Sequence, residues 1–164
     1  MQVGIVSDTH DNARYVERAV SYFEQQGVDA VVHCGDFVAP FSATPFDADF
    51  DFYAVRGNND GEWALQNVVG EFGTYLGEMG ELTFDGTDFA VYHGTSRPIV
   101  DALVDCGRYD YVVHGHTHEK ATEERNGTVR INPGGIPIPD APAPPNAVVV
   151  ETDSGAVHVE SLSD

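Results

Sequence analysis

Five short polar motifs recur along the 164-residue chain, and each contains a side chain that can bind a metal ion. In chain order they are Asp8-Thr9-His10, Gly35-Asp36, Gly57-Asn58-Asn59-Asp60, His93-Gly94 and Gly115-His116-Thr117-His118. Carboxylates, imidazoles and an amide without thiolate suit Mn, Fe, Zn or Ni better than a soft metal. Because two aspartates and four histidines exceed what one tetrahedral zinc requires, the set predicts a dinuclear site with one bridging carboxylate.

Apolar runs precede these motifs and predict the strands that position them. Strands are predicted over residues 3–6, 30–33, 50–55, 82–84, 89–92, 109–113, 147–150 and 157–162, and helices over 12–26 and 98–106. Strand, helix, strand at the start is a βαβ unit with parallel pairing, whereas 85–88 join a hairpin. The sequence therefore predicts an α/β fold with mixed sheets, whose motifs gather at the carboxyl ends of strands, where such sheets bind ligands.

The limits of the first predicted helix come from its capping residues. Asp11 or Asn12 can cap its start, and Gly27 can end it. Far along the chain, residues 133–145 contain six prolines and are predicted to form an irregular loop. Isolated histidines carry less information: His33, His114 and His158 are interpreted as ordinary polar surface residues.

The charge balance is the abnormal feature of the composition. Asp and Glu total 27 against 8 basic residues, of which only Lys120 is a lysine, and the net charge is −19. Self-repulsion at this charge destabilises a small domain unless salt screens it, so the composition resembles that of proteins from a salt-rich, halophilic cytoplasm. An acidic protein without salt adaptation is the alternative. Nonspecific nucleic-acid binding is not expected, because it requires clustered Lys and Arg.

Length and composition predict one globular domain over residues 1–164. Apolar residues make up 41% of the chain, and no apolar run approaches the ~20 residues of a membrane helix. The first residues run directly into a predicted strand, so no signal peptide is expected. Cys34 and Cys106 are the only cysteines; they predict a reducing compartment and two small buried side chains. We therefore expect a cytoplasmic protein without a membrane span.

The ordered series D-x-H, G-D, G-N-x-D, H-G and G-H-x-H strongly resembles that of the calcineurin-like metallophosphoesterases. The short length and Ile131-Asn132-Pro133-Gly134 resemble the compact bacterial and archaeal phosphodiesterase branch, which includes a eukaryotic retromer subunit of related fold. The resemblance extends from residue 3 to about residue 135. It implies two mixed β-sheets packed together and flanked by helices. It also implies hydrolysis of small phosphate esters, diesters above all, by attack of a metal-bridging hydroxide.

The resemblance also implies a role for each motif residue. Asp8, His10 and His118 would hold one divalent ion, Asn58, His93 and His116 the other, and Asp36 would bridge them. Manganese is the expected ion, with Ni, Fe and Zn as alternatives. The residues expected to take part in catalysis are Asp36, Asn58, Asn59, Asp60 and His93. Asp60 would orient a metal-bound histidine or cap a helix, and Arg56 would contact phosphate or form a salt bridge.

Two positions depart from the pattern of the family. Many members carry a histidine where this chain has Asn59, and that histidine donates a proton to the leaving group. Because an amide cannot act as a general acid, we expect slow hydrolysis of monoesters with poor leaving groups. The compact branch commonly has serine where this chain has Gly135, a change without a functional explanation in the sequence.

Two other functions compete with hydrolysis of phosphate esters as explanations of the sequence. The metallo-β-lactamase-like signature H-x-H-x-D-H is excluded, because Glu119 and Lys120 occupy the positions of its Asp and His. A non-catalytic scaffold that binds protein partners on the same fold remains the alternative. Retention of all seven ligand types argues against it. The sequence leaves the oligomeric state open, a homo-oligomer included.

The acidic composition predicts a response to salt. Without screening, repulsion among the excess carboxylates should loosen the fold and repel an anionic substrate. We expect the melting temperature and the phosphoesterase activity both to rise from low salt to molar potassium chloride. A flat response of both quantities would show that the acidity is not a salt adaptation.

Overall fold

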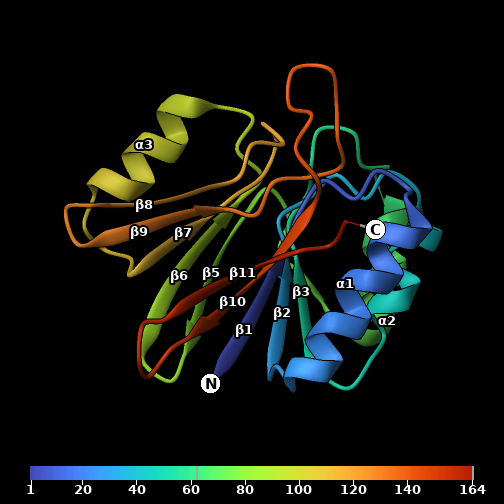
Figure 1. The fold of residues 1–164 in the computed structure, drawn as a ribbon, viewed down its shortest axis with the longest axis horizontal. Helices are drawn as coiled ribbons and strands as arrows, with labels where there is room; N and C mark the ends of the chain where they lie inside the picture. Colours follow the sequence, from blue (N-terminus) through green and yellow to red (C-terminus); the bar gives the residue numbers. More distant parts are fainter. Residues whose placement is uncertain (62, 164) are drawn as a thin grey trace.

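The computed structural model describes residues 1–61 and 63–163 and contains two mixed β-sheets flanked by helices (Figure 1), as predicted. The first sheet has the order β11-β10-β1-β2-β3-β4 and the second the order β5-β6-β7-β9-β8. The strands are β1 (Gln2–Val6), β2 (Ala30–His33), β3 (Asp51–Ala54), β4 (Thr74–Tyr75), β5 (Met79–Phe84), β6 (Thr87–Tyr92), β7 (Tyr111–Val113), β8 (Ala121–Arg125), β9 (Thr128–Asn132), β10 (Asn146–Glu151) and β11 (Val157–Ser161). The helices are α1 (Ala13–Gln26), α2 (Trp63–Phe72) and α3 (Arg97–Asp105).

Both sheets have a parallel centre. In the first sheet β1, β2 and β3 are parallel, and in the second β6, β7 and β9 are parallel. The predicted βαβ unit is therefore present as β1, α1 and β2. Parallel neighbours end at the same edge of a sheet, so the loops that follow these six strands can contribute side chains to one place.

Side chains of β1 alternate between the two layers of the core. Val3 and Ile5 point between the sheets, where they pack with Val91 and Ile131 of the second sheet. Val6 instead packs in the cluster that α1 and α2 cover. All five are fully buried, and burial of a Val or Ile side chain contributes about 1.5–3 kcal/mol. The alternation keeps β1 rigid at the point where it leads into the first polar motif.

Helix α1 begins and ends where the sequence predicts, and the structure shows which of Asp11 and Asn12 is the N-cap. Asn12 is the N-cap, since its side chain accepts a hydrogen bond from Tyr15 N at 3.0 Å. Gly27 ends the helix in the left-handed conformation, at φ 67°. Asp11 has another role: its Oδ1 accepts from Ala39 N at 2.8 Å and so ties the loop after β1 to the loop after β2.

The predicted elements are all present, but α2, β4 and the β8–β9 hairpin were not predicted from the sequence. Strand β8 carries mostly exposed polar side chains and therefore shows no alternation of apolar residues. A signal was nevertheless available, because Asn126-Gly127 is a typical two-residue hairpin turn. Both residues adopt positive φ, 56° and 83°. Helix α2 contains Gly70, which weakens the helical pattern in the sequence.

Three expectations about burial were wrong. His33 and His114 are buried, not on the surface. The ring of His33 stacks on Phe37 with centroids 3.5 Å apart, and the ring of His114 accepts a hydrogen bond from Arg130, so packing and pairing offset the cost of burial. Cys34 is buried as predicted, but Cys106 is exposed because it lies at the C-terminal end of α3.

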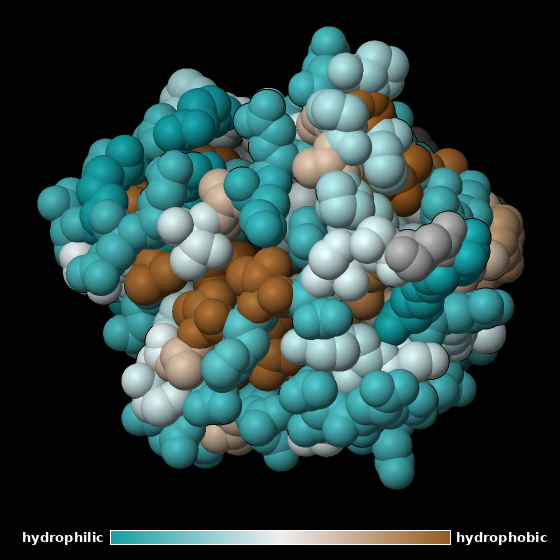
Figure 2. Space-filling view, viewed as in Figure 1, coloured by the Kyte–Doolittle hydropathy of each residue, from teal (hydrophilic) through white to brown (hydrophobic). Residues whose placement is uncertain are grey.

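The surface is mainly polar. Figure 2 shows one face covered largely by hydrophilic side chains, with a hydrophobic patch in the area of β10 and β11. Strand β11 contributes an exposed apolar side chain, Val159. Within residues 1–61 and 63–163, no helix is both long and apolar enough to cross a membrane.

Candidate metal centre

The polar motifs meet where the carboxyl ends of the two sheets adjoin. Asp8, Asp36 and Asn58 follow β1, β2 and β3 of the first sheet. His93 follows β6, and His116 and His118 follow β7 of the second sheet. Backbone hydrogen bonds fasten the loops together within each sheet, as from Asp8 N to Gly35 O at 3.0 Å and from Gly115 N to His93 O at 2.8 Å. The seven residues predicted as metal ligands are thereby brought to one site.

One half of the site contains Asp8, His10 and His118. Their ligand atoms lie within 4.8 Å of one another. Nε2 of His118 lies 3.5 Å from Asp8 Oδ1 and 3.2 Å from Nε2 of His10. Asp8 is fully buried and its carboxylate accepts from the backbone N–H of His116, which fixes it across the junction of the sheets.

The other half contains His93, Asn58 and His116. Asn58 Oδ1 lies 3.1 Å from His93 Nε2 and 2.9 Å from His116 Nδ1. Asp36 lies between the two halves, because its Oδ2 is 3.5 Å from His10 Nε2 and 3.3 Å from His93 Nε2. Asp8, Asp36 and His93 form a second group whose ligand atoms lie within 4.8 Å. The arrangement thus has two adjacent ligand clusters that share carboxylates.

The protonation of two imidazoles follows from their outer hydrogen bonds. Nδ1 of His93 lies 2.7 Å from Cys34 O, and Nδ1 of His118 lies 2.7 Å from Ile136 O. A carbonyl oxygen can only accept, so Nδ1 carries the proton in both rings. In the neutral tautomer Nε2 then presents a lone pair toward a carboxylate oxygen. Two lone pairs facing each other repel unless a proton or a metal cation lies between them, so the donor set fits a cation.

The pKa values have the same electrostatic origin. The carboxylates of Asp8, whose Oδ1 lies 3.9 Å from His10 Nε2, and of Asp36 raise the pKa of His10, although burial opposes them. Burial would lower the pKa of His93, but Asp36 and Asp8 raise it overall. Burial favours the neutral form of Asp36, yet the protonated form of the His93 ring and hydrogen bonds from Asn59 hold its pKa well below the ordinary value. The site therefore retains its carboxylate charge and attracts positive charge.

Backbone strain is concentrated at the ligands. Asp8, His10, Asp36, His116 and His118 all have positive φ, between 42° and 71°. A non-glycine residue in this region costs of order 1 kcal/mol or more and persists only where the surroundings impose it. Here the strain turns successive side chains such as His116 and His118 toward the same site.

Asn59 and Asp60 hold the ligand loops together. Asn59 N donates to Asp36 Oδ1 and Asn59 Nδ2 donates to Asp36 Oδ2, both at 2.8 Å. Asp60 accepts from the backbone N–H groups of Asp36 at 3.0 Å, Gly57 at 2.7 Å and Val38 at 2.9 Å. Burial raises the pKa of Asp60 in spite of these three donors. Among the described residues its hydrogen-bond donors are backbone N–H groups and no histidine, so the expectation that Asp60 orients a metal-bound histidine was wrong.

Two further side chains are explained by their contacts. Arg56 pairs with Glu78 at 3.1 Å, which is the salt-bridge role considered from the sequence. Gly135 lies against Asp8 and His118, and an added Cβ would overlap the Cβ of Asp8. The absence of a side chain at this position therefore follows from the close approach of the loop to a buried ligand.

Comparison with known proteins agrees with this architecture. The fold and site together are those of a metallophosphoesterase. The chain belongs to the calcineurin-like phosphoesterase superfamily, whose domain model matches residues 1–155. Phosphodiesterase MJ0936 of Methanocaldococcus jannaschii is 35% identical over 141 residues, which cover 82% of this chain and 83% of that protein. Phosphodiesterase YfcE of Escherichia coli is 25% identical over an alignment covering 100% of this chain and 94% of its own.

Solved structures share the fold closely. A structure described as a novel archaeal phosphodiesterase has a TM-score of 0.90 at 29% identity and covers 98% of this chain and 99% of that one. Vps29 of Entamoeba histolytica in complex with zinc has a TM-score of 0.71 at 17% identity, with coverage of 99% and 100%. These likenesses confirm the predicted family and fold, and they identify the chain as a phosphoesterase by relationship.

The three backbone hydrogen bonds of Asp60 yield a prediction about stability. Asp60→Asn replaces one acceptor oxygen by an NH2 group that faces a backbone donor, so we expect a loss of about 1–3 kcal/mol in the unfolding free energy. Metal content should fall with it, because Asp36 loses its backbone anchor. Urea denaturation and elemental analysis measure the two effects.

Asp29→Asn is the matched control for Asp60→Asn. Asp29 also accepts a backbone hydrogen bond, from Gln2 N at 2.7 Å, but it is exposed and precedes β2, at the end of the strand opposite to Asp36. Asp29→Asn changes the net charge by the same amount as Asp60→Asn, but it should leave the metal content of the protein unchanged. Equal effects of the two substitutions would contradict the anchoring role.

Proposed function

We propose that this protein is a dinuclear-metal phosphodiesterase, in which Asp8, His10 and His118 hold one ion and Asn58, His93 and His116 the other. The observation that carries the proposal is the position of Asp36, whose Oδ2 lies within 3.5 Å of an imidazole nitrogen from each cluster. A carboxylate in that position can bridge two ions. Imidazole and carboxylate ligands together suit manganese, with Ni, Fe and Zn as alternatives.

The proposed reaction is hydrolysis of a small phosphate ester by in-line displacement. Bound divalent ions would supply a hydroxide nucleophile at neutral pH and clamp the attacking and leaving oxygens. The side chains of the protein orient that chemistry: His93 and His118 are fixed by their Nδ1–H bonds to carbonyls, and Asp36 by Asn59. Such outer hydrogen bonds commonly change metal affinity or activity by about 10–100-fold.

Diesters are proposed as the preferred substrates, because Asn59 cannot donate a proton to the leaving group and no other donor is evident. Both donor groups of Asn59 that face the site are hydrogen-bonded to Asp36. The leaving group of an activated diester departs without being protonated. The alkoxide leaving group of an alkyl monoester requires protonation. The names of two relatives, phosphodiesterases MJ0936 and YfcE, are consistent with this preference.

The remaining parts of the proposal concern the setting of the enzyme. We propose that it works in the cytoplasm of a salt-rich cell, because its net charge is −19 and it has one lysine. A scaffold without catalysis is less well supported, since all seven ligand types are retained and their side chains converge. The oligomeric state stays open.

Removal of Asp36 tests the dinuclear assignment. Asp36→Ala should bind fewer than two metal ions per chain, because each cluster loses a shared ligand. Hydrolysis of bis(p-nitrophenyl) phosphate should fall by more than about 100-fold, beyond the usual effect of losing an outer hydrogen bond. Asp49→Ala removes the same group from an exposed position and serves as the control. Near-normal turnover by Asp36→Ala would refute the proposed mechanism.

The role of Asn59 predicts how rates depend on the leaving group. For the wild-type enzyme, rates across a graded series of aryl esters should fall steeply as the pKa of the leaving group rises. Asn59→His should help poor leaving groups most and flatten this dependence, since general acid catalysis contributes ~10²–10⁴-fold. Asn59→Ala is the matched variant, because it also loses the bond to Asp36 but gains no proton donor.

All three proteins are assayed with the same metal ion. If the rate of the wild-type enzyme does not depend on the leaving group while chemistry limits turnover, another residue supplies the proton. An equally steep dependence for Asn59→His and Asn59→Ala would likewise contradict the prediction.

A further inference from the structure

A cavity of about 490 Å³ opens beside the metal centre. Its walls come from the loop between β6 and α3, from the residues that follow β7, and from β8 and β9. His116, one of the candidate ligands, lines it, as does Gly94, which directly follows His93. The volume lies in the range of small-molecule sites, so a substrate held at the metal centre has room to extend here.

The cavity collects positive charge in a chain that has little of it. Three of the 8 basic residues of the protein line it, namely Arg97, Lys120 and Arg130. Glu119 and Glu123 are the acidic residues in its wall. Basic residues thus outnumber acidic ones here, whereas acidic residues outnumber basic ones 27 to 8 in the whole chain. This local excess of basic residues, together with the candidate ligand His116 in the wall, suits the cavity to an anion.

Two of the three cations have donors to spare. The ammonium of Lys120 forms no hydrogen bond or ion pair with the residues that the structure describes. Arg97 binds Asp101 through Nε at 3.1 Å, and its two Nη groups have no partner among those residues. Arg130 is fixed in the wall, since it donates to His114 Nε2 at 3.0 Å and to Glu123 Oε2 at 2.9 Å. Lys120 and Arg97 can therefore turn toward a ligand while Arg130 contributes a fixed charge.

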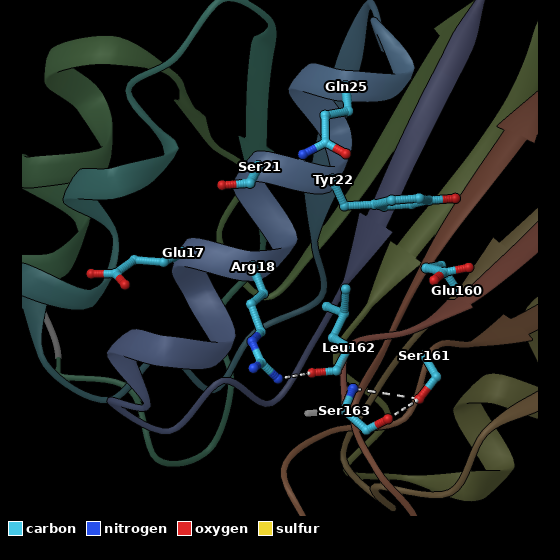
Figure 3. Close-up of a pocket in the computed structure, with 9 residues that line it drawn as sticks. All are labelled: Glu17, Arg18, Ser21, Tyr22, Gln25, Glu160, Ser161, Leu162 and Ser163. Carbon is cyan, nitrogen blue, oxygen red and sulfur yellow. Dashed lines mark hydrogen bonds between the residues drawn. The ribbon is translucent and has the colours of Figure 1, made fainter.

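Another hollow of similar size shows the opposite balance. It lies between α1 and the C-terminal segment (Figure 3) and measures about 430 Å³. Glu17 and Glu160 line it with a single arginine, Arg18, which donates to Leu162 O at 2.8 Å. Acidic residues outnumber basic ones there, as they do over the chain. Hollows in this protein are therefore not basic in general; the hollow lined by Arg14 and Arg18 is basic too, but it contains no candidate metal ligand.

We propose that the cavity beside His116 binds a second phosphate group of the substrate, in the part that extends beyond the scissile ester. The inference rests on the proposed function and narrows it to phosphodiesters that carry a further phosphate. Lys120 and the Nη groups of Arg97 bind that phosphate, and Arg130 adds its charge from the wall. Charge-assisted hydrogen bonds to a phosphate favour such a substrate in binding over one that ends in a neutral group.

A matched set of diesters tests the proposal. The substrates are p-nitrophenyl alkyl phosphates whose alkyl arm has two, four or six carbons and ends in either a phosphate or a hydroxyl group. The full chain loaded with manganese releases p-nitrophenol from the same bond in every case, at one fixed potassium chloride concentration. For at least one arm length we expect kcat/KM to favour the phosphate by on the order of tenfold, mainly through KM, as one charge-assisted hydrogen bond would give.

Single-charge variants separate local contacts from the general field. Lys120→Gln and Arg97→Gln should each bring the preference for the phosphate toward one. Arg108→Gln removes the same charge from an exposed residue outside the cavity that pairs with Glu81 at 3.1 Å, and it should keep the preference. An equal loss of preference in all three variants would overturn the proposal.

The two proposals fail in different ways. Hydrolysis of the substrates without preference at any arm length overturns the second phosphate site and leaves the phosphodiesterase function intact. Absence of hydrolysis from every substrate, with metal bound, overturns the phosphodiesterase function and this inference with it.

Discussion

The convergence of lone pairs at the junction of the two sheets is the constraint on which the rest of this structure depends. His93 and His118 are held by carbonyls so that Nε2 faces a carboxylate oxygen 3.3–3.5 Å away. Without a cation this contact is repulsive, so the fold must supply enough stability to hold it. Two sheets with parallel centres meet that requirement, because each delivers rigid strand ends to the same edge.

Backbone hydrogen bonds around the candidate ligands offset the free energy that this repulsion and the backbone strain cost. Five of the seven candidate ligands have positive φ, and each such residue costs roughly 1–3 kcal/mol. Against this, His10 N donates to Asp36 O, and Asp60 accepts from three backbone N–H groups of the loops after β2 and β3. The loops are thus bound to each other as well as to the sheets. A network of this kind keeps a strained site in one geometry, which a dinuclear centre requires.

The sequence was sufficient to predict the fold and the polar side chains that gather at one site, because both depend on residue types at regular places. Apolar runs identify strands, and Asp, Asn and His after several of them identify a metal site. The positions of Asn59 and Asp60 were a different problem. Nothing local shows that an amide or a carboxylate will turn back onto Asp36 from 23 or 24 residues away, since that contact exists only once β2 and β3 lie side by side.

The burial of two histidines could not be predicted from the sequence either. His33 is the last residue of β2 and His114 directly follows β7, close to where the candidate ligands lie, yet the ring of His33 stacks on Phe37 and that of His114 is bound by Arg130. A histidine in a strand end is therefore ambiguous until its neighbours in space are known. The β8–β9 hairpin was different, because its Asn-Gly turn was visible and only the exposed polar face of β8 concealed it.

The charge of the protein acts on two length scales. A net charge of −19 repels an anionic substrate from a distance, and this repulsion extends about one Debye length, roughly 10 Å at 0.1 M salt and 3 Å at 1 M. Contacts that the candidate metal centre and the cavity beside His116 would make with a substrate act at hydrogen-bond distance, where salt screens them far less. Raising the salt concentration therefore weakens the long-range repulsion more than the local attraction. In concentrated salt an acidic surface and an anion-binding site become compatible in one small protein, because the surface no longer opposes what the site attracts.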